Sequence, residues 1–196
     1  MNDETIWIID AQKGDDNAYA ALVEAWQKPV YNFCYRMLGE SEEAEDAAQE
    51  TFLRAYQHLE RYDIQRPFGT WLLSIAAHHC IDRLRRMRRI SFSLDANEAI
   101  ETWFPDGHAA NPEEEAFGRV EGERLDSLVQ TLEPAPRAAL VMRYWQGATE
   151  QEIARALHLS LPAVKSRLHR ARQSLAKRLL AQQEGLPMAG KALREI

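Results

Sequence analysis

The segment that decides the fold is residues 148–179, "ATEQEIARALHLSLPAVKSRLHRARQSLAKRL". It contains two helix starts close together. Thr149 with Glu152 fits a capping box, and Ser160 is a favourable N-cap residue. The first helix is predicted over about 150–157, and the second begins after Ser160. Two short helices joined by such a turn form a helix-turn-helix.

The second of these helices has an apolar side and a basic side. Its apolar residues recur at helical spacing and are predicted to be buried: Val164, Leu168, Ala171, Leu175 and Leu179. The other side is polar and largely basic: Lys165, Ser166, Arg167, His169, Arg170 and Gln173. In a helix-turn-helix this helix enters the major groove, where Lys and Arg reach guanine edges and phosphates. A basic helix can also be a solvated face or a membrane-surface helix, but the paired helix, the cap and the turn favour DNA.

The net charge of −6 hides three parts with different compositions. Residues 1–90 carry 15 acids and 11 bases, residues 91–123 nine acids and one base, and residues 124–196 six acids and twelve bases. The middle part also contains Pro, Gly and a Glu triplet without clear periodicity, which is typical of a linker. We therefore predict an N-terminal domain over 1–90, an acidic flexible linker over 91–123, a C-terminal domain over 124–182 and a flexible tail over 183–196.

Helical periodicity dominates the chain outside the linker. The segment 41–59 is predicted to be a helix with Ser41 as its N-cap and one apolar stripe: Ala44, Ala48, Phe52, Ala55 and Leu59. The helix before it contains Pro29, where a kink or break is expected, and ends at Gly39. Another long helix is predicted from about Thr70. No segment alternates as a strand would, so the fold class is all-α, with two small helical domains that each have their own core.

The bulk composition is that of an ordinary globular protein. Of the 196 residues, 45% are hydrophobic and 28% are charged. No apolar run approaches the ~18–20 residues that span a bilayer, and the acidic N-terminus is unlike a signal peptide. Cys34 and Cys80 lie far apart without CxxC spacing, so we interpret them as reduced thiols. The expected location is the cytoplasm, with no membrane insertion by the chain itself.

From about Gly14 to Leu179, the chain resembles the extracytoplasmic-function sigma factors of bacterial RNA polymerase. Three segments carry the resemblance. "DAAQETFLRAYQHL" at 46–59 resembles the family's polymerase-binding helix, and "PFGTWLLSIAAHHCIDRLRR" at 67–86 resembles its promoter-melting helix. "LVQTLEPAPRAALVMRYWQGATEQEIARALHLSLPAVKSRLHRARQSL" at 128–175 resembles its helix-turn-helix domain. The resemblance implies a factor that binds core polymerase, recognises the promoter −35 and −10 elements and promotes DNA melting.

The resemblance assigns polymerase binding to the helix at 46–59. Its face would dock on the coiled-coil clamp of the beta-prime subunit, through charge pairs around an apolar centre. The residues on the family's positions are Asp46, Gln49, Glu50, Phe52, Leu53 and Arg54. Taken by itself, Phe52 is expected to belong to the core.

The resemblance assigns −10 recognition to the helix at 67–86 and to the loop at about 62–68 before it. The implied residues are Trp71, His78, His79, Asp82, Arg83, Arg85 and Arg86. In the family, one base is flipped out of the stack, which costs a few kcal/mol. Aromatic stacking and a cationic groove must offset that cost. Trp71 is also expected to anchor the helix in the core, and the run "IAAHH" departs from the Asn that many relatives carry near position 78.

The resemblance assigns −35 recognition to the C-terminal domain. The implied residues are Arg143, Lys165, Ser166, Arg167, His169 and Arg170. Leu128, Leu132 and Leu140 could offer apolar surface to the polymerase beta flap, although a place in the core is favoured. The implied partners are core polymerase, through the beta-prime clamp and the beta flap, promoter DNA and an anti-sigma factor.

A metal enzyme is one alternative. His78, His79 and Asp82, together with the carboxylates of 42–50, could be imagined as ligands. However, adjacent histidines point to different sides of a helix, and no HExxH or comparable spacing is present. No nucleophile motif or glycine-rich phosphate loop appears either. We therefore predict no catalytic residues, no metal and no cofactor.

An ordinary helix-turn-helix regulator is the second alternative, with residues 1–90 as a sensor or dimerisation module. It would bind a palindromic duplex operator without polymerase. This reading explains the C-terminal half of the chain, but not the polymerase-docking motif. Dependence on core polymerase would distinguish the two.

Overall fold

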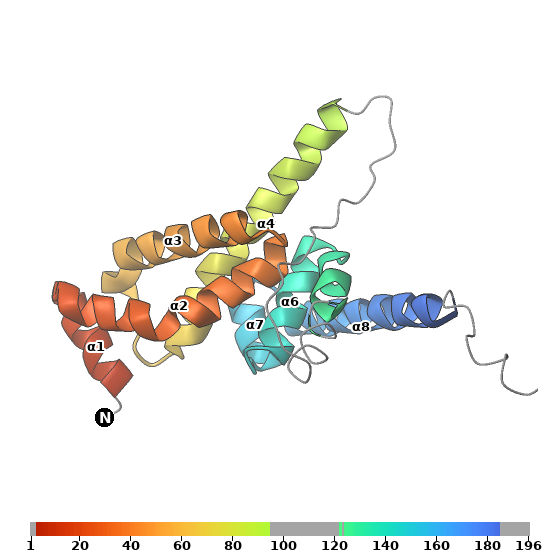
Figure 1. Ribbon diagram of the computed structural model, residues 1–196. Helices are drawn as coiled ribbons and strands as arrows, with labels where there is room; N and C mark the ends of the chain where they lie inside the picture. Colours follow the sequence, from red (N-terminus) through yellow and green to blue (C-terminus); the bar gives the residue numbers. More distant parts are fainter. Residues whose placement is uncertain (1–2, 95–121, 123, 185–196) are drawn as a thin grey trace, which may run out of the picture.

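The computed structural model describes residues 3–94, 122 and 124–184, and within these ranges the chain is helical and contains no strand (Figure 1). The predicted all-α class is confirmed. We call residues 3–94 the N-terminal unit and residues 124–184 the C-terminal unit. Within the described residues, no helix combines the length and the apolar character needed to cross a membrane.

The N-terminal unit is built from four α-helices and a short 3-10 turn. These are α1 (Asp3–Gln12), α2 (Asp16–Leu38), α3 (Ser41–His58), η1 (Leu59–Arg61) and α4 (Phe68–Leu94). α2, α3 and α4 pack against one another, and α1 packs on α2. Phe33, Met37 and Leu72 are fully buried where these helices meet. The apolar stripe predicted for α3 faces this core, with Ala44, Ala55 and Leu59 buried.

The expected ends of α2 and α3 are only partly correct. α2 continues through Pro29 without a break. Ala25, one turn earlier, lies on the exposed side of the helix, where water can hydrate the carbonyl that Pro29 leaves without a donor. Gly39 ends α2 as predicted, with φ 93° and its N–H donating to Tyr35 O at 2.8 Å. The N-cap of α3 is Glu40 rather than Ser41, because the extended backbone at Glu40 already precedes the first helical residue.

Gly39→Ala is expected to lower the free energy of unfolding by about 1–2 kcal/mol. Alanine would be strained at this positive φ, and its Cβ would lie 2.9 Å from Oε1 of Gln130 in the C-terminal unit. Urea denaturation followed by circular dichroism measures the loss. Gly14→Ala is the matched control, because Gly14 has φ 94° but no atom within 4 Å of an added Cβ. Equal losses in the two variants would show that the Gln130 contact costs nothing.

The C-terminal unit contains the predicted helix-turn-helix. Its helices are a segment over 124–130, α6 (Pro134–Tyr144), α7 (Glu150–Ala156) and α8 (Leu161–Glu184). The capping box at the start of α7 is confirmed, since the Glu152 N–H donates to Thr149 Oγ1 at 3.2 Å and the Thr149 N–H donates to Glu152 Oε2 at 2.7 Å. Ser160 Oγ accepts from the Ala163 N–H at 3.4 Å, as expected of the N-cap of α8.

The buried side of α8 is shorter than predicted. Val164, Leu168 and Ala171 are buried, but Leu179 is 36% exposed, so its predicted burial is wrong. In Figure 1 the C-terminal half of α8 runs out past α6 and α7, the helices on which its first turns pack. The apolar spacing therefore continues along the helix after its packing partners have ended.

The two helical domains that the sequence predicted are present as these two units, and one continuous apolar core runs through both of them. α4 packs against α6 and α7, and α2 packs against α6. The same buried cluster includes Leu72 and Ala76 of α4 and Leu140 and Ile153 of the C-terminal unit. The physical reason is size: small helical units have too little interior to bury all their apolar surface separately.

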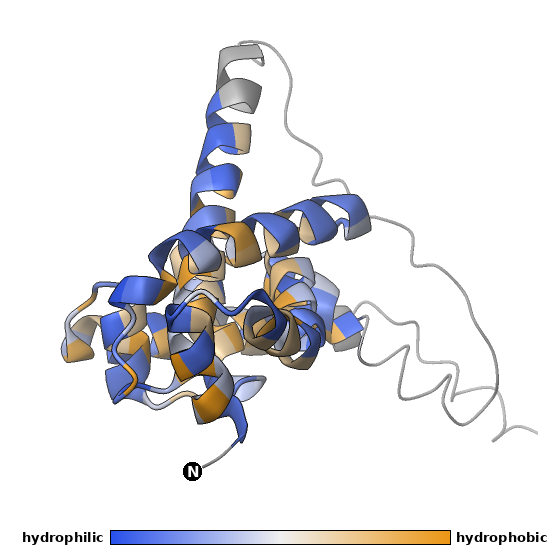
Figure 2. Cartoon of the chain, turned by 90° about the vertical axis from the view of Figure 1, so that its left-hand side faces the viewer, coloured by the Kyte–Doolittle hydropathy of each residue, from blue (hydrophilic) through white to orange (hydrophobic). Residues whose placement is uncertain are grey.

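The C-terminal half of α4 projects away from the packed helices (Figure 1), and its surface up to Arg89 is predominantly hydrophilic (Figure 2). Its exposed arginines are Arg85, Arg86, Arg88 and Arg89. α4 reaches Leu94 and α8 reaches Glu184, beyond the domain limits of 90 and 182 expected from composition. The rest of the predicted linker and tail lies outside the described residues.

Candidate functional site

Two faces of α4 carry different candidate residues. Thr70, Ser74 and His78 follow one another at four-residue spacing, and the His78 ring lies 5.1 Å from the ring of His158 in the C-terminal unit. His79 instead lines a groove shared with α3. The expectation that the adjacent histidines point to different sides is confirmed. Of the two, His78 faces the helix-turn-helix, and His79 lies among the residues assigned to polymerase binding.

The outer face of α3 presents an exposed apolar residue among polar ones. Leu53 is 55% exposed, and Asp46 and Gln49 are exposed beside it. Glu50 and Arg54 form an ion pair with an Oε1–Nε distance of 2.6 Å. Phe52 packs against the core as expected. An exposed leucine surrounded by charged groups is suited to contact with another protein.

Arg83 connects α4 to this face of α3. Its guanidinium forms ion pairs with the carboxylates of Glu43 and Asp46, the latter at 3.9 Å. A residue assigned to the −10 element and a residue assigned to polymerase docking therefore meet in one cluster. Further along α4, Nη1 of Arg85 lies 3.9 Å from Oδ1 of Asp82. Both of these side chains and that of Arg86 are exposed.

Burial and neighbouring cations lower the pKa of His79 below its usual value of 6.5. Desolvation is the main cause, and Arg54, Arg83 and Arg86 add to it, whereas Glu50 opposes it. Because the folded-state pKa is lower than the unfolded-state pKa, the neutral imidazole is favoured in the folded protein. The resulting stabilisation is present above about pH 6.5 and is lost as the pH falls through the folded-state pKa.

His79→Asn is therefore expected to make stability less sensitive to acid. Between about pH 7 and about pH 5.5, the urea midpoint of the wild type should fall more than that of the variant, because only the wild type must protonate a disfavoured imidazole. The control is His58→Asn, an exposed histidine in the last turn of α3. If the His79 variant followed the wild type across this range, the assigned pKa shift would be wrong.

Three aromatic rings gather at the start of α4. Tyr62 contacts Trp71 and Phe68, with ring centroids 4.6 and 5.5 Å apart, and Phe68 lies 5.6 Å from Trp71. The Tyr62 hydroxyl donates to the Arg66 carbonyl, which holds the preceding loop against the helix. Phe68 and Tyr62 are buried, whereas Trp71 is half-buried. Trp71 thus anchors the helix as expected, and its half-buried side chain also lines a cavity.

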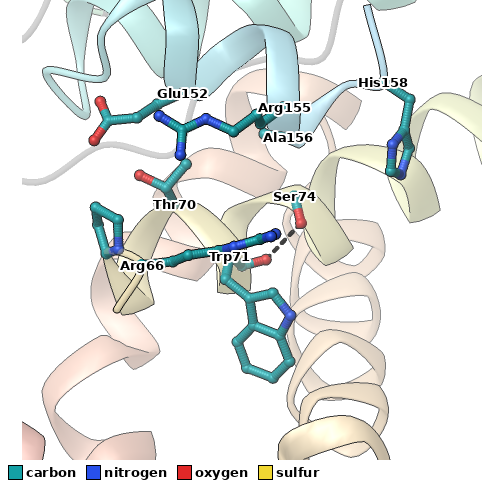
Figure 3. A pocket seen from close by; sticks show the side chains of 9 residues that line it. Arg66, Thr70, Trp71, Ser74, Glu152, Arg155, Ala156 and His158 are labelled. Carbon is teal, nitrogen blue, oxygen red and sulfur yellow. Dashed lines mark hydrogen bonds between the residues drawn. The ribbon is translucent and has the colours of Figure 1, made fainter. Parts of the chain in front are cut away.

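A cavity of about 290 Å³ lies between this aromatic group and the helix-turn-helix (Figure 3). Arg155 of α7 extends toward Thr70 of α4, and Ser74 donates to the Trp71 carbonyl at 2.6 Å. Thr70 and Ser74 were not among the predicted site residues. Their four-residue spacing with His78 was the sequence pattern that could have indicated them.

The basic face of α8 is open to solvent. Lys165, His169 and Arg170 are exposed, and Ser166 and Arg167 are half-exposed. Lys165 lies 3.8 Å from the Glu150 carboxylate at the start of α7. This places the cationic side chains assigned to the −35 element on the first turns of α8, as the periodicity predicted.

Arg143 of α6 is exposed and donates to the Ala148 carbonyl at 3.0 Å, so it also supports the turn before α7. Leu128, Leu132 and Leu140 are buried, which confirms the core interpretation of these leucines.

The two cysteines lie together in the core of the N-terminal unit. Cys34 of α2 and Cys80 of α4 are both free and fully buried. The hydrogen bond with Cys34 and burial raise the pKa of the Cys80 thiol well above its usual value. Both effects favour the protonated, unreactive thiol. Their proximity was not predicted, because 46 positions separate them in the sequence.

Comparison with known proteins identifies the family. Residues 22–90 match the model of Sigma-70 region 2, and residues 122–175 match that of Sigma-70 region 4. The chain is 35% identical over 179 residues to the ECF RNA polymerase sigma factor SigW of Bacillus subtilis, covering 88% of this chain and 94% of SigW. The chain belongs to the extracytoplasmic-function (ECF) sigma factors of RNA polymerase.

Solved structures share the fold of this ECF sigma factor. CnrH in complex with the cytosolic domain of CnrY is 24% identical, with a TM-score of 0.65, over 92% of this chain and 99% of CnrH. The sigma factor RpoE in complex with the anti-sigma factor NepR from Bartonella quintana is 18% identical, with a TM-score of 0.63, over 83% and 96% of the two chains. At these identities the likeness establishes the fold.

Proposed function

We propose that this ECF sigma factor initiates transcription by using three separate surfaces. The outer face of α3 binds the beta-prime clamp of core polymerase. The basic face of α8 holds the −35 duplex, and α4 with the loop before it captures and opens the −10 element. The protein performs no catalytic step of its own, and it works in the cytoplasm, where polymerase acts.

The observation that carries this proposal is the exposed Leu53 on α3, surrounded by Asp46, Gln49 and Glu50. This face does not suit DNA, because its carboxylates and the DNA phosphates are both negatively charged and repel each other. A protein partner with basic and apolar residues fits this face. The face therefore supports polymerase docking and disfavours an autonomous helix-turn-helix regulator.

The start of α4 has the chemistry needed to hold an unstacked base. Extracting a base from the stack costs a few kcal/mol. Stacking of the extracted base on an aromatic ring stabilises the bound state by about 1–3 kcal/mol per base. Trp71 is the half-buried ring at this place, and it packs against the rings of Tyr62 and Phe68. The exposed Arg85 and Arg86 would hold the backbone phosphates of the opened strand.

The first turns of α8 have the chemistry needed to hold a duplex. Arg170 and Lys165 are exposed and long enough to reach base edges or phosphates. Arg143 and Arg167 would contribute phosphate contacts that fix the docking register. Base choice would depend on His169, whose ring offers both a donor and an acceptor.

In vitro transcription tests the proposal. Purified bacterial core polymerase, with and without the protein, would transcribe genomic fragments selected by their binding to the reconstituted complex. We expect start-specific transcripts only with the protein. Arg170→Ala should weaken promoter binding by about tenfold or more, since one good base contact is worth about 1–3 kcal/mol. Lys177→Ala, an exposed change further along α8, is the control.

A different result would replace the proposal. If the protein ignored core polymerase and bound a palindromic duplex operator alone, the helix-turn-helix regulator would be the correct function. If Lys177→Ala weakened binding as much as Arg170→Ala, the contacts on α8 would be general electrostatics rather than recognition.

We also propose an anti-sigma partner. The titles of the two similar structures describe complexes of CnrH with CnrY and of RpoE with the anti-sigma factor NepR. Affinity purification of the tagged chain from its native cell, under non-inducing conditions, should recover one stoichiometric protein that inhibits the transcription assay. Recovery of polymerase subunits alone would contradict this partner.

A further inference from the structure

Arg83 lies on the side of α4 that faces α3. It follows His79 by four residues, and both side chains line the groove of about 470 Å³ that α4 shares with α3. Asp82 and Arg85 lie on another stripe of the helix, since they follow His78 by four and seven residues. The resemblance assigned all of these residues to the −10 element, but the helix separates them into two groups.

Arginines pair with the carboxylates of the outer face of α3. Arg54 forms the ion pair with Glu50, at 2.6 Å from Nε to Oε1. Arg83 contacts the Glu43 carboxylate, and its Nη2 lies 3.9 Å from Oδ2 of Asp46. Glu43 and Asp46 are three residues apart on α3, so their like charges repel each other. Arg83 offsets that repulsion from the neighbouring helix.

The exposure of these groups places Arg83 beneath the carboxylates. The Arg83 side chain is 29% exposed and that of Glu43 34%, whereas the Asp46 side chain is 69% exposed. A protein that covers this face removes water from the carboxylates, which is costly unless each keeps a counter-charge. Arg83 supplies that counter-charge from inside the protein, and Asp46 stays open to a cation that approaches from outside.

The same contacts make Arg83 a poor site for DNA. A phosphate that approached its guanidinium would also approach the carboxylates of Glu43 and Asp46, which repel it. Arg85 has different surroundings, because its side chain is 62% exposed and its ion pair with Asp82 is long, at 3.9 Å. Arg85 is therefore the better phosphate ligand of the two arginines.

We propose that Arg83 acts in polymerase docking rather than in contact with the −10 element. It is a positioning residue, which holds Glu43 and Asp46 in place for a basic side chain of the polymerase. Arg83 does not itself meet that side chain, because the two cations repel each other. This inference rests on the proposed function and adds a residue of α4 to the docking surface.

Two affinities measured on the full-length protein separate docking from DNA contact. The first is for core polymerase. The second is the affinity of preformed holoenzyme for a promoter fragment whose non-template strand is unpaired across the −10 element. Arg83→Gln should lower the first about tenfold and leave the second unchanged. Arg85→Gln, the matched change on the other stripe, should leave the first unchanged, weaken the second and reduce its salt slope by about one.

A double-mutant cycle shows whether Arg83 acts through Asp46. Asp46→Asn should weaken polymerase binding, and Arg83→Gln should cost much less in that background than in the wild type. Arg83→Lys keeps a cation beside the carboxylates and should recover part of the lost affinity. The urea midpoint of each variant is measured in parallel, so that a loss of folded protein is not counted as a loss of affinity.

The possible results decide between this inference and the alternatives. Unchanged or increased polymerase affinity in Arg83→Gln would overturn it, and so would losses that add in full in the cycle. Weaker promoter binding by the Arg83→Gln holoenzyme, at unchanged polymerase affinity, would return Arg83 to the −10 element. If the wild type itself failed to bind core polymerase, the proposed function would fall, and this inference with it.

Discussion

Leu53→Glu is expected to weaken binding to core polymerase at least about 100-fold and to abolish promoter-dependent transcription. Leu53 is the exposed apolar residue at the centre of the α3 face. A glutamate there would bring an unpaired charge into a desolvated interface beside the carboxylates of Asp46 and Glu50. Residues at the centre of an interface contribute most of its binding energy, so this single change should have a large effect.

The fold should tolerate this change, because the Leu53 side chain is mostly in water. Binding is measured by titrating labelled protein with core polymerase, and the urea midpoint is measured in parallel. Gln57→Glu is the matched control, since it adds the same charge to the exposed surface of α3 one turn further on. Unchanged polymerase affinity in the Leu53 variant would place the docking surface elsewhere on the molecule.

Arg137→Ala is expected to lower the free energy of unfolding by about 3 kcal/mol or more. The change removes the donors for the carbonyls of Met37, Gln130 and Leu132, in a place that the protein otherwise closes to water. Each buried acceptor left without a donor costs about 1–3 kcal/mol, and partial entry of water reduces the total. The loss should also remove the connection between the two units.

Arg172→Ala provides the comparison for this prediction. Arg172 is an exposed arginine of α8 in the same unit, so the exchange removes the same side chain from the surface. We expect its urea midpoint to stay close to that of the wild type. A loss of less than about 1 kcal/mol in the Arg137 variant would mean that water replaces the guanidinium without cost, and that the arginine does not hold the units together.

These predictions concern two different surfaces of the N-terminal unit. The α3 face is open in the free chain and is tested by polymerase affinity. The face of α2 and α4 that meets the C-terminal unit is covered, and it is tested by the stability of the Arg137 variant. Arg83 links the two surfaces, because it is paired with Glu43 and Asp46 of α3 while lying on α4. A partner that binds Asp46 would therefore change the surroundings of Arg83.

The sequence by itself determined the local structure of this protein. The capping box of Thr149 and Glu152, the N-cap at Ser160 and the glycine that ends α2 are all found where the residues predicted them. The buried residues of α3 and the first turns of α8 follow the predicted stripes. Such features depend on residues three or four positions apart, whose side chains interact within one helix. The basic face of α8 could be identified from sequence for the same reason.

Only the tertiary structure decided which helices pack together and which distant residues come into contact. Arg137 donates to a carbonyl 100 residues away, and nothing near it in the sequence distinguishes it from a surface arginine. The sequence could assign His78 and His79 to different sides of α4, but it could not show that His78 lies beside His158 in the turn after α7 and that His79 lies in a groove shared with α3. The same holds for the Cys34–Cys80 pair and for the single core that joins the two units. These contacts depend on which helices pack together, and that choice is made by the summed burial of many side chains rather than by any local pattern.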